Sequence, residues 1–212
     1  MTTLNALFNS PITIAVSLTL GFVVGRFRVY QLQNQGETAV RRTIAKAFGA
    51  PDYHMMNSVT VPTRDGTTQI DHILVSRFGI FVIETKHYGG AVYATPTAAT
   101  WTQAFAKSKF KFQNPIFQNY KHIKAIQSLL HFLPADAVHS VVVFTGDAQF
   151  KTPRPEGVFL LSEVVSHIKG FNTDVLTREH LESCVGRIEC RRLALTRHTD
   201  VEHRTRLKRK FG

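Results

Sequence analysis

Two neighbouring runs of β-branched and aromatic residues constrain the fold most. They cover Gln69 to Ser76 and Ile80 to Lys86, and only the segment RFG joins them. Short runs of this type on either side of a turn predict an antiparallel strand pair. The pair carries Asp71 and Glu84 as well as Lys86, where a plain buried hairpin would have apolar residues. The fold must therefore place three charged side chains beside its core.

The rest of the chain predicts a mixed α/β sheet flanked by helices. Apolar residues at helical spacing alternate with short apolar runs that are typical of strands. The run Val138 to Gly146 is continuously apolar and predicts a strand buried on both faces. We expect helices at 30–49, 114–133, 162–171 and 177–195, and further strands at 53–62, 91–94 and 157–162.

The N-terminal segment predicts a membrane anchor. The first 25 residues carry no charge, and Arg26 and Arg28 follow at once. The apolar run Leu7 to Val24 has the length needed to cross a hydrocarbon core of about 30 Å. By the positive-inside rule, an anchor at residues 1–29 holds the rest of the chain in the cytoplasm, at a bacterial-type inner membrane. A buried or disordered N-terminal helix stays open, because a proline and several hydroxyl residues interrupt the run.

The charge balance favours a polyanionic partner. Lysine and arginine number 26 against 15 acidic residues, which gives a net charge of +11 and a pI near 10.0. Nucleic acid and an anionic membrane surface both fit. The closing run HRTRLKRKFG holds many of these charges and suits nucleic acid, lipid or a solubilising role. We expect the anchor at 1–29, a globular domain at 30–170, and a C-terminal helix with this basic tail at 171–212.

The three charged residues of the strand pair form a candidate site whose geometry depends on the turn. Glu84 and Lys86 are two residues apart, so they project from the same face of a strand. A two-residue loop places Asp71 on that face, opposite Glu84, whereas a three-residue loop with a bulge at Gly79 places it on the other face. Both arrangements stay open from sequence alone.

A divalent metal explains why two carboxylates would lie together. Neighbouring buried carboxylates repel each other unless a cation lies between them. Magnesium prefers oxygen ligands and bridges to phosphate, and a nearby ammonium stabilises charge that develops on a phosphodiester. Asp71, Glu84 and Lys86 thus suit phosphodiester cleavage. The alternative is an ion-paired surface, in which Lys86 neutralises Glu84, because E-x-K is a common tripeptide.

Five motifs between about Gly36 and Leu130 resemble the nuclease-related domain (NERD) family, a relative of the PD-(D/E)xK restriction-endonuclease-like superfamily. The motifs are GE at 36–37, QIDH at 69–72, GIFVIETK at 79–86, Trp101 and NPIFQN at 114–119. The resemblance implies a restriction-endonuclease-like sheet in a DNA-cleaving enzyme that uses Mg²⁺ or Mn²⁺.

The same resemblance implies catalytic, metal-binding or substrate-binding roles for individual residues. Asp71 and Glu84 would be metal ligands, and Lys86 would be the catalytic lysine. Glu37 would be an added ligand or would orient the metal-bound water. Gln69 and Gln118 would hold the substrate phosphate or a second water.

A second candidate feature interleaves lysines with phenylalanines. The segment WTQAFAKSKFKFQNP carries Lys107, Lys109 and Lys111 among Phe105, Phe110 and Phe112. Such a pattern suits a surface that contacts phosphates and stacks on bases. The alternative is amphipathic packing, with the rings in the core and the lysines in water.

The sequence therefore predicts a membrane-anchored, metal-dependent nuclease that acts on DNA. Two other classes stay open. One is an inactive nucleic-acid-binding or membrane-scaffolding domain of nuclease-like fold, and the other is a protein that acts at a lipid surface through its basic residues.

Overall fold

The structure is a computed structural model that describes residues 11–194, and within 11–30 the side chains of residues 15, 16, 19, 20, 23 and 24. The chain divides into two compact units after Gln35. The basic tail and the first ten residues of the predicted anchor lie outside the described residues.

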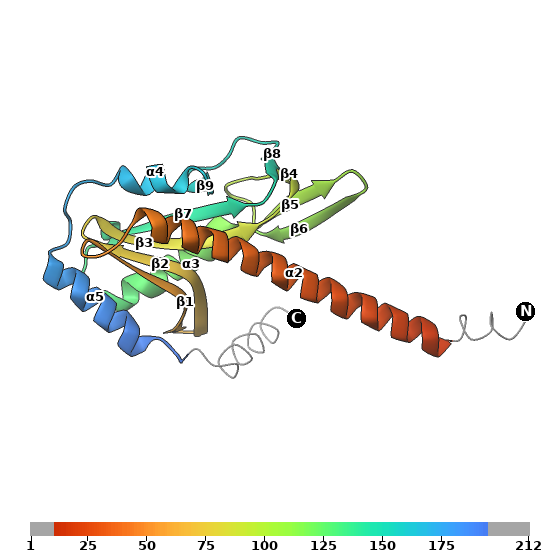
Figure 1. Cartoon of the computed structure of the whole chain (residues 1–212), viewed down its shortest axis with the longest axis horizontal. Coiled ribbons are helices and arrows are strands. Elements are labelled where there is room, and N and C mark those ends of the chain that lie inside the picture. Colours follow the sequence, from red (N-terminus) through yellow and green to blue (C-terminus); the bar gives the residue numbers. More distant parts are fainter. Residues whose placement is uncertain (1–10, 195–212) are drawn as a thin grey trace, which may run out of the picture. The chain divides into compact units, whose positions relative to one another are not determined.

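The first unit contains the beginning of a long helix, α2 (Pro11–Ala47) (Figure 1). Within residues 11–194, no helix is long and apolar enough to cross a membrane. The predicted N-terminal membrane-spanning helix therefore has no support from the structure.

The second unit is built on two mixed sheets with helices packed on them, which confirms the predicted α/β class (Figure 1). The larger sheet has the order β1-β2-β3-β7-β9. Its first three strands form an antiparallel meander, and β7 and β9 add to it in parallel. The bounds are β1 (Tyr53–Thr63), β2 (Gly66–Ser76), β3 (Gly79–His87), β7 (Val138–Thr145) and β9 (Val158–Leu160).

The smaller sheet contains three strands that the sequence pattern did not predict, β5, β6 and β8. Its order is β6-β5-β4-β8, with β5 and β6 paired as a hairpin. The bounds are β4 (Gly90–Tyr93), β5 (Thr100–Phe105), β6 (Ser108–Gln113) and β8 (Ala148–Phe150). The helices that follow β6 are α3 (Pro115–Leu129), η1 (Ala135–Ala137), α4 (Val164–Lys169) and α5 (Arg178–Arg191).

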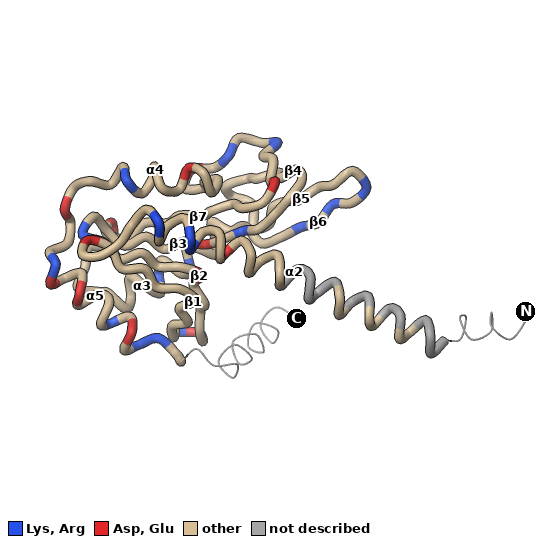
Figure 2. Tube along the Cα trace, viewed as in Figure 1, with Lys and Arg blue, Asp and Glu red and all other residues tan. Residues whose placement is uncertain are grey.

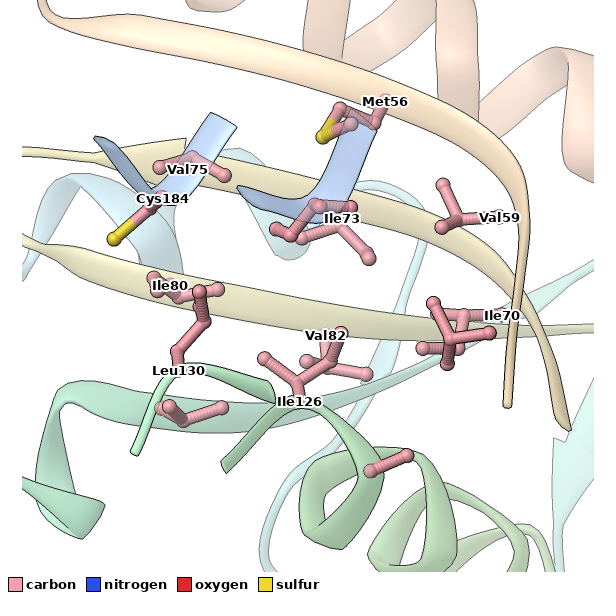
Figure 3. Packing of buried hydrophobic residues seen from close by; sticks show 14 of the residues in the cluster. Met56, Val59, Ile70, Ile73, Val75, Ile80, Val82, Ile126, Leu130 and Cys184 are labelled. Carbon is pink, nitrogen blue, oxygen red and sulfur yellow. The ribbon is translucent and has the colours of Figure 1, made fainter. Parts of the chain in front are cut away.

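The alternation along β2 and β3 separates two cores. Ile73 and Val82 belong to the core that includes α3 and α5 (Figure 3), whereas Leu74 and Ile83 belong to the core that includes α2 and α4. Residues of β3 with even numbers therefore face α3, and Glu84 and Lys86 have this parity. Along β2 the alternation does not continue through Asp71, because Ile70 lies in the same core as Ile73.

Helix α3 is fixed to the sheet at its N-terminal end. Asn114 caps it by accepting a hydrogen bond from the Ile116 amide, and Pro115 occupies the first turn, where no amide hydrogen is needed. The buried Asn119 amide donates to the Val82 carbonyl at 2.9 Å and to the Ser140 hydroxyl at 2.8 Å. These bonds hold the first turns of α3 beside the middle of β3 and β7.

Gly36 allows α2 to approach the ends of β3 and β7 closely. A Cβ atom at this position would lie 2.7 Å from His87 Cβ and 2.7 Å from Thr145 Oγ1. Real Cβ atoms do not approach other atoms this closely, so any larger residue forces the helix away from the sheet. The glycine of the GE pair thus sets the position of Glu37, which follows it.

We expect Gly36→Ala to lower the free energy of unfolding by about 1–3 kcal/mol, the usual cost of overpacking. The matched control is Gly186→Ala in α5, where the added Cβ would meet nothing within 4 Å. It should raise stability by about 0.5–1 kcal/mol, because alanine favours helix. Urea unfolding followed by circular dichroism measures both changes, and equal effects would contradict the close approach at Gly36.

Candidate active site

The turn between β2 and β3 has two residues, Arg77 and Phe78, because Ser76 pairs with Gly79. The same register pairs His72 with Ile83 and ends there, so Asp71 and Glu84 lie just beyond the last paired residues. The carboxylate of Glu84 lies on the face that α3 covers, where it meets His122, and Asp71 lies within electrostatic range of Glu84 and Lys86. The loop length is the one that the metal hypothesis required, and a metal held between the two carboxylates stays a prediction.

Asp71 lies where β2 and β3 begin to diverge. Its Oδ2 atom accepts a hydrogen bond from the Thr85 amide at 2.7 Å. Burial raises the pKa of Asp71 well above its usual range, and the charges of Glu84 and Glu37 raise it further. Its negative charge is therefore not fully compensated by the surrounding protein.

Glu84 is the most deeply buried acid of the site, with 1% of its side chain exposed. Lys86 Nζ lies 2.6 Å from one carboxylate oxygen, and His122 Nε2 lies 3.1 Å from the other. Burial alone would raise the pKa of Glu84, but Lys86 and then His122 outweigh it, and the pKa is lowered. Glu84 is thus held as an anion with both oxygens paired.

Lys86 is held as a cation between β3 and α3. Burial disfavours its charge, yet the neighbouring Glu84 outweighs this effect and raises the pKa of Lys86. Its ammonium also donates a hydrogen bond to Gln118 Oε1 at 2.9 Å. Gln118 thus contacts the proposed catalytic lysine, and its role in holding the substrate phosphate or a second water stays a prediction.

His122 is a site residue that the sequence analysis missed. It is buried, and its Nδ1 atom lies 2.8 Å from the Thr68 hydroxyl while Nε2 faces Glu84. The imidazole thus connects β2 to β3 through α3. One sequence feature could have indicated His122 as a site residue. It follows Gln118 by four residues and therefore lies on the same face of the helix.

Glu37 comes from the helix on the opposite side of the larger sheet from α3. The structure places it within electrostatic range of Asp71, because its charge contributes to the raised pKa of that carboxyl. His72, next to Asp71, faces the same side as α2 and forms a hydrogen bond with Asn57 at 2.8 Å. His72 therefore packs and forms a hydrogen bond on the other side of the sheet from His122.

The remaining predicted substrate residues lie at different places. Gln69 is half-buried on β2, two residues before Asp71 and next to Thr68, which contacts His122. Lys107, Lys109 and Lys111 are exposed on the β5–β6 hairpin, whose tip carries basic residues in Figure 2. The structure therefore does not bring these lysines into the cluster around Lys86.

The donor set suits a divalent cation in its chemistry and charge. Carboxylate oxygens are the ligands that Mg²⁺ and Mn²⁺ prefer, and the uncompensated charge at Asp71 is what a cation would relieve. Within residues 11–194, no group of three or more His, Cys, Asp or Glu side chains is arranged to hold a metal ion. The metal-ligand roles of Asp71, Glu84 and Glu37 therefore stay predictions.

Comparison with known proteins identifies the class to which this fold and site belong. Residues 32–145, more than half of the chain, match the family described as the nuclease-related domain (NERD). The chain belongs to this family, and the two mixed sheets flanked by helices fit a nuclease-like fold. The placement in the PD-(D/E)xK superfamily is consistent with this family.

A curated relative is an uncharacterized protein of Bacillus anthracis, 45% identical over 120 residues. The aligned part covers 56% of this chain and 56% of that relative. The chain thus matches little more than half the length of the relative. No solved structure matches the chain.

Proposed function

We propose that this protein is a metal-dependent phosphodiester hydrolase that acts on nucleic acid, with DNA as the expected substrate. The observation that carries the proposal is the closeness of Asp71 to the buried Glu84–Lys86 pair, both of whose charges act on its carboxyl group. One carboxylate is electrostatically unsatisfied and the other is held ionised beside an ammonium. A purely structural ion pair would not need the second carboxylate.

Each residue has a defined part in this proposal. Asp71 and Glu84 would hold Mg²⁺ or Mn²⁺, which supplies charge neutralisation and lowers the pKa of a bound water. Lys86 stabilises charge that develops on the phosphodiester, and Gln118 holds the Lys86 ammonium in place. Nucleases of the PD-(D/E)xK type usually use divalent metals.

His122 and Thr68 act as positioning residues in this arrangement. The buried imidazole fixes the Glu84 carboxylate, and the Thr68 hydroxyl fixes the imidazole. The side chain of Glu84 therefore keeps one orientation whether or not substrate is present.

A second candidate function, an inactive nucleic-acid-binding domain of the same fold, has its own observation. Both oxygens of Glu84 are paired by Lys86 and His122, so this carboxylate is satisfied by the protein alone. A site that has lost catalysis would keep this pair for stability.

Cleavage by the full chain separates the two functions. Labelled DNA and RNA, each single-stranded and double-stranded, are incubated with Mg²⁺, with Mn²⁺ or with EDTA. The proposal predicts cleavage of DNA that requires the metal. Absence of cleavage of every substrate, with nucleic-acid binding retained, would support the inactive domain and refute the nuclease.

We further propose that residues 1–29 hold the domain on the cytoplasmic side of a bacterial-type inner membrane. The support is the sequence, in which 25 uncharged residues precede Arg26 and Arg28. Membranes from expressing cells are washed with alkaline carbonate. An anchored chain stays in the pellet, and its release into the wash would contradict the anchor.

A further inference from the structure

We propose that single-stranded nucleic acid binds along one aromatic face of the β5–β6 hairpin. We call the aromatic face the set Tyr88, Phe112, Phe110 and Phe105. This inference rests on the proposed function, because it names the substrate class that the site would receive, but it is tested by binding without cleavage.

The strand register places the three phenylalanines on the same side of the hairpin. Trp101 pairs with Phe112, and Phe105 pairs with Ser108. Phe110 and Phe112 are two residues apart on β6, so they share a face with each other and with Phe105. Lys109 has the opposite parity and projects from the other side, so the hairpin separates its rings from its lysines.

The rings of this face are half-buried at the base of the hairpin and exposed toward its tip. Trp101 is buried at the base, and Phe112 is half-buried beside it with its ring 4.6 Å from the ring of Tyr88. Phe110 is 55% exposed and Phe105 is 48% exposed. Their rings meet edge to face, with centroids 6.4 Å apart. Two large apolar rings that touch each other in solvent mark a surface for contact with another molecule.

The aromatic face begins beside the candidate active site. Tyr88 follows Lys86 by two residues, and its hydroxyl lies within electrostatic range of the site. Burial raises the pKa of Tyr88, while the charge of Lys86 lowers it and that of Glu84 raises it. A chain that lies on the aromatic face would thus lead from the hairpin tip to the catalytic groups.

The chemistry of the face favours a single strand over a duplex. Unpaired bases offer flat faces that stack on aromatic side chains, whereas the bases of a duplex already stack on one another. Lys107, Lys109 and Lys111 are exposed on the turn and on β6, which is the edge strand of its sheet. Their ammonium groups are therefore available to phosphates at the rim of the hairpin.

The test measures binding of a fluorescent single-stranded DNA 20-mer, the matching RNA and the DNA duplex to the full chain in EDTA. Fluorescence anisotropy compares wild type with the double variant Phe105→Ala and Phe110→Ala. The matched control is Phe132→Ala, which removes a ring 43% exposed from beyond the C-terminal end of α3. A second double variant, Phe105→Tyr with Phe110→Tyr, keeps both rings.

We expect the alanine pair to weaken single-strand binding at least ~10-fold, since each stacked base contributes about 1–3 kcal/mol. The duplex affinity should change less than ~2-fold. The tyrosine pair and the Phe132 control should bind the single strand like wild type. Similar effects on DNA and RNA single strands would show that stacking, and not the sugar, carries the recognition.

Three results would overturn the inference. The first is equal affinity of the alanine pair and wild type for the single strand, and the second is an equal loss for single strand and duplex. The third is binding of anionic lipid vesicles that the alanine pair abolishes, with no single-strand binding by wild type. Binding that depends on the two rings, without cleavage of any substrate, would support this inference and refute only the nuclease proposal. Cleavage of DNA without ring-dependent binding would refute this inference and support the nuclease proposal.

Discussion

Replacement of Lys86 by methionine is expected to have the largest single effect on both activity and stability. Cleavage should fall at least ~10²-fold, because the ammonium that stabilises developing charge is lost. The free energy of unfolding should fall by about 3–5 kcal/mol, because Glu84 stays buried without its main counter-charge. Urea unfolding and a cleavage assay on the same preparation measure both effects.

A double variant separates the catalytic role of Lys86 from its structural role. Glu84→Gln combined with Lys86→Met removes both charges and leaves an amide that still bonds to His122. This variant should recover most of the lost stability, since replacing both members of a buried ion pair is close to neutral, and it should remain inactive. The control Lys124→Met changes an exposed lysine of α3 and should alter neither property. Recovered cleavage in the double variant would contradict a catalytic role for the pair.

Asp71→Asn is expected to have the second large effect. Unlike Lys86→Met, it should raise the free energy of unfolding. In EDTA at neutral pH this variant should be more stable than wild type, because it removes a charge that burial, Glu84 and Glu37 all disfavour. The same variant should lose cleavage, since asparagine cannot supply a charged metal ligand. The free energy of unfolding and the cleavage rate should therefore change in opposite senses.

The difference in free energy of unfolding between Asp71→Asn and wild type should depend on pH, because the pKa of Asp71 is raised. The folded pKa lies above the unfolded value of about 3.9. The stability that this group contributes is therefore complete below the unfolded pKa and is lost as the pH rises through the folded pKa. The advantage of Asp71→Asn should grow with rising pH and vanish in acid. The control Asp147→Asn changes an exposed carboxylate, and an identical pH profile for the two variants would contradict the account of Asp71.

Sequence was sufficient to predict that Asp71, Glu84 and Lys86 lie close together. The period of two along a strand places Glu84 and Lys86 on one face, and the short turn brings Asp71 near them, although the alternation along β2 is interrupted before Asp71. The same periodicities predicted the helices and strands of the larger sheet. The turn itself could not be decided from sequence, because the glycine at its end also suits a three-residue loop with a bulge.

The features that sequence missed depend on contacts between distant segments. The β5–β6 hairpin has exposed lysines and phenylalanines and turns through Ala106 and Lys107, without the Gly or Asn that marks a tight turn. His122 becomes part of the site only because α3 packs across β2 and β3, 54 residues from Thr68 along the chain. The interpretation of Phe105 and Phe110 as core residues was wrong for these two rings, although Phe112 does pack against Trp101.

Titration of the full chain with Mn²⁺ tests most directly whether the carboxylate pair holds a metal. Calorimetry at neutral pH should show a binding site in wild type that Asp71→Asn abolishes. Lys86→Met should retain the site, because methionine removes a competing charge from Glu84 without removing a ligand. Equal Mn²⁺ binding by wild type and Asp71→Asn, or none by wild type, would contradict the metal-dependent site.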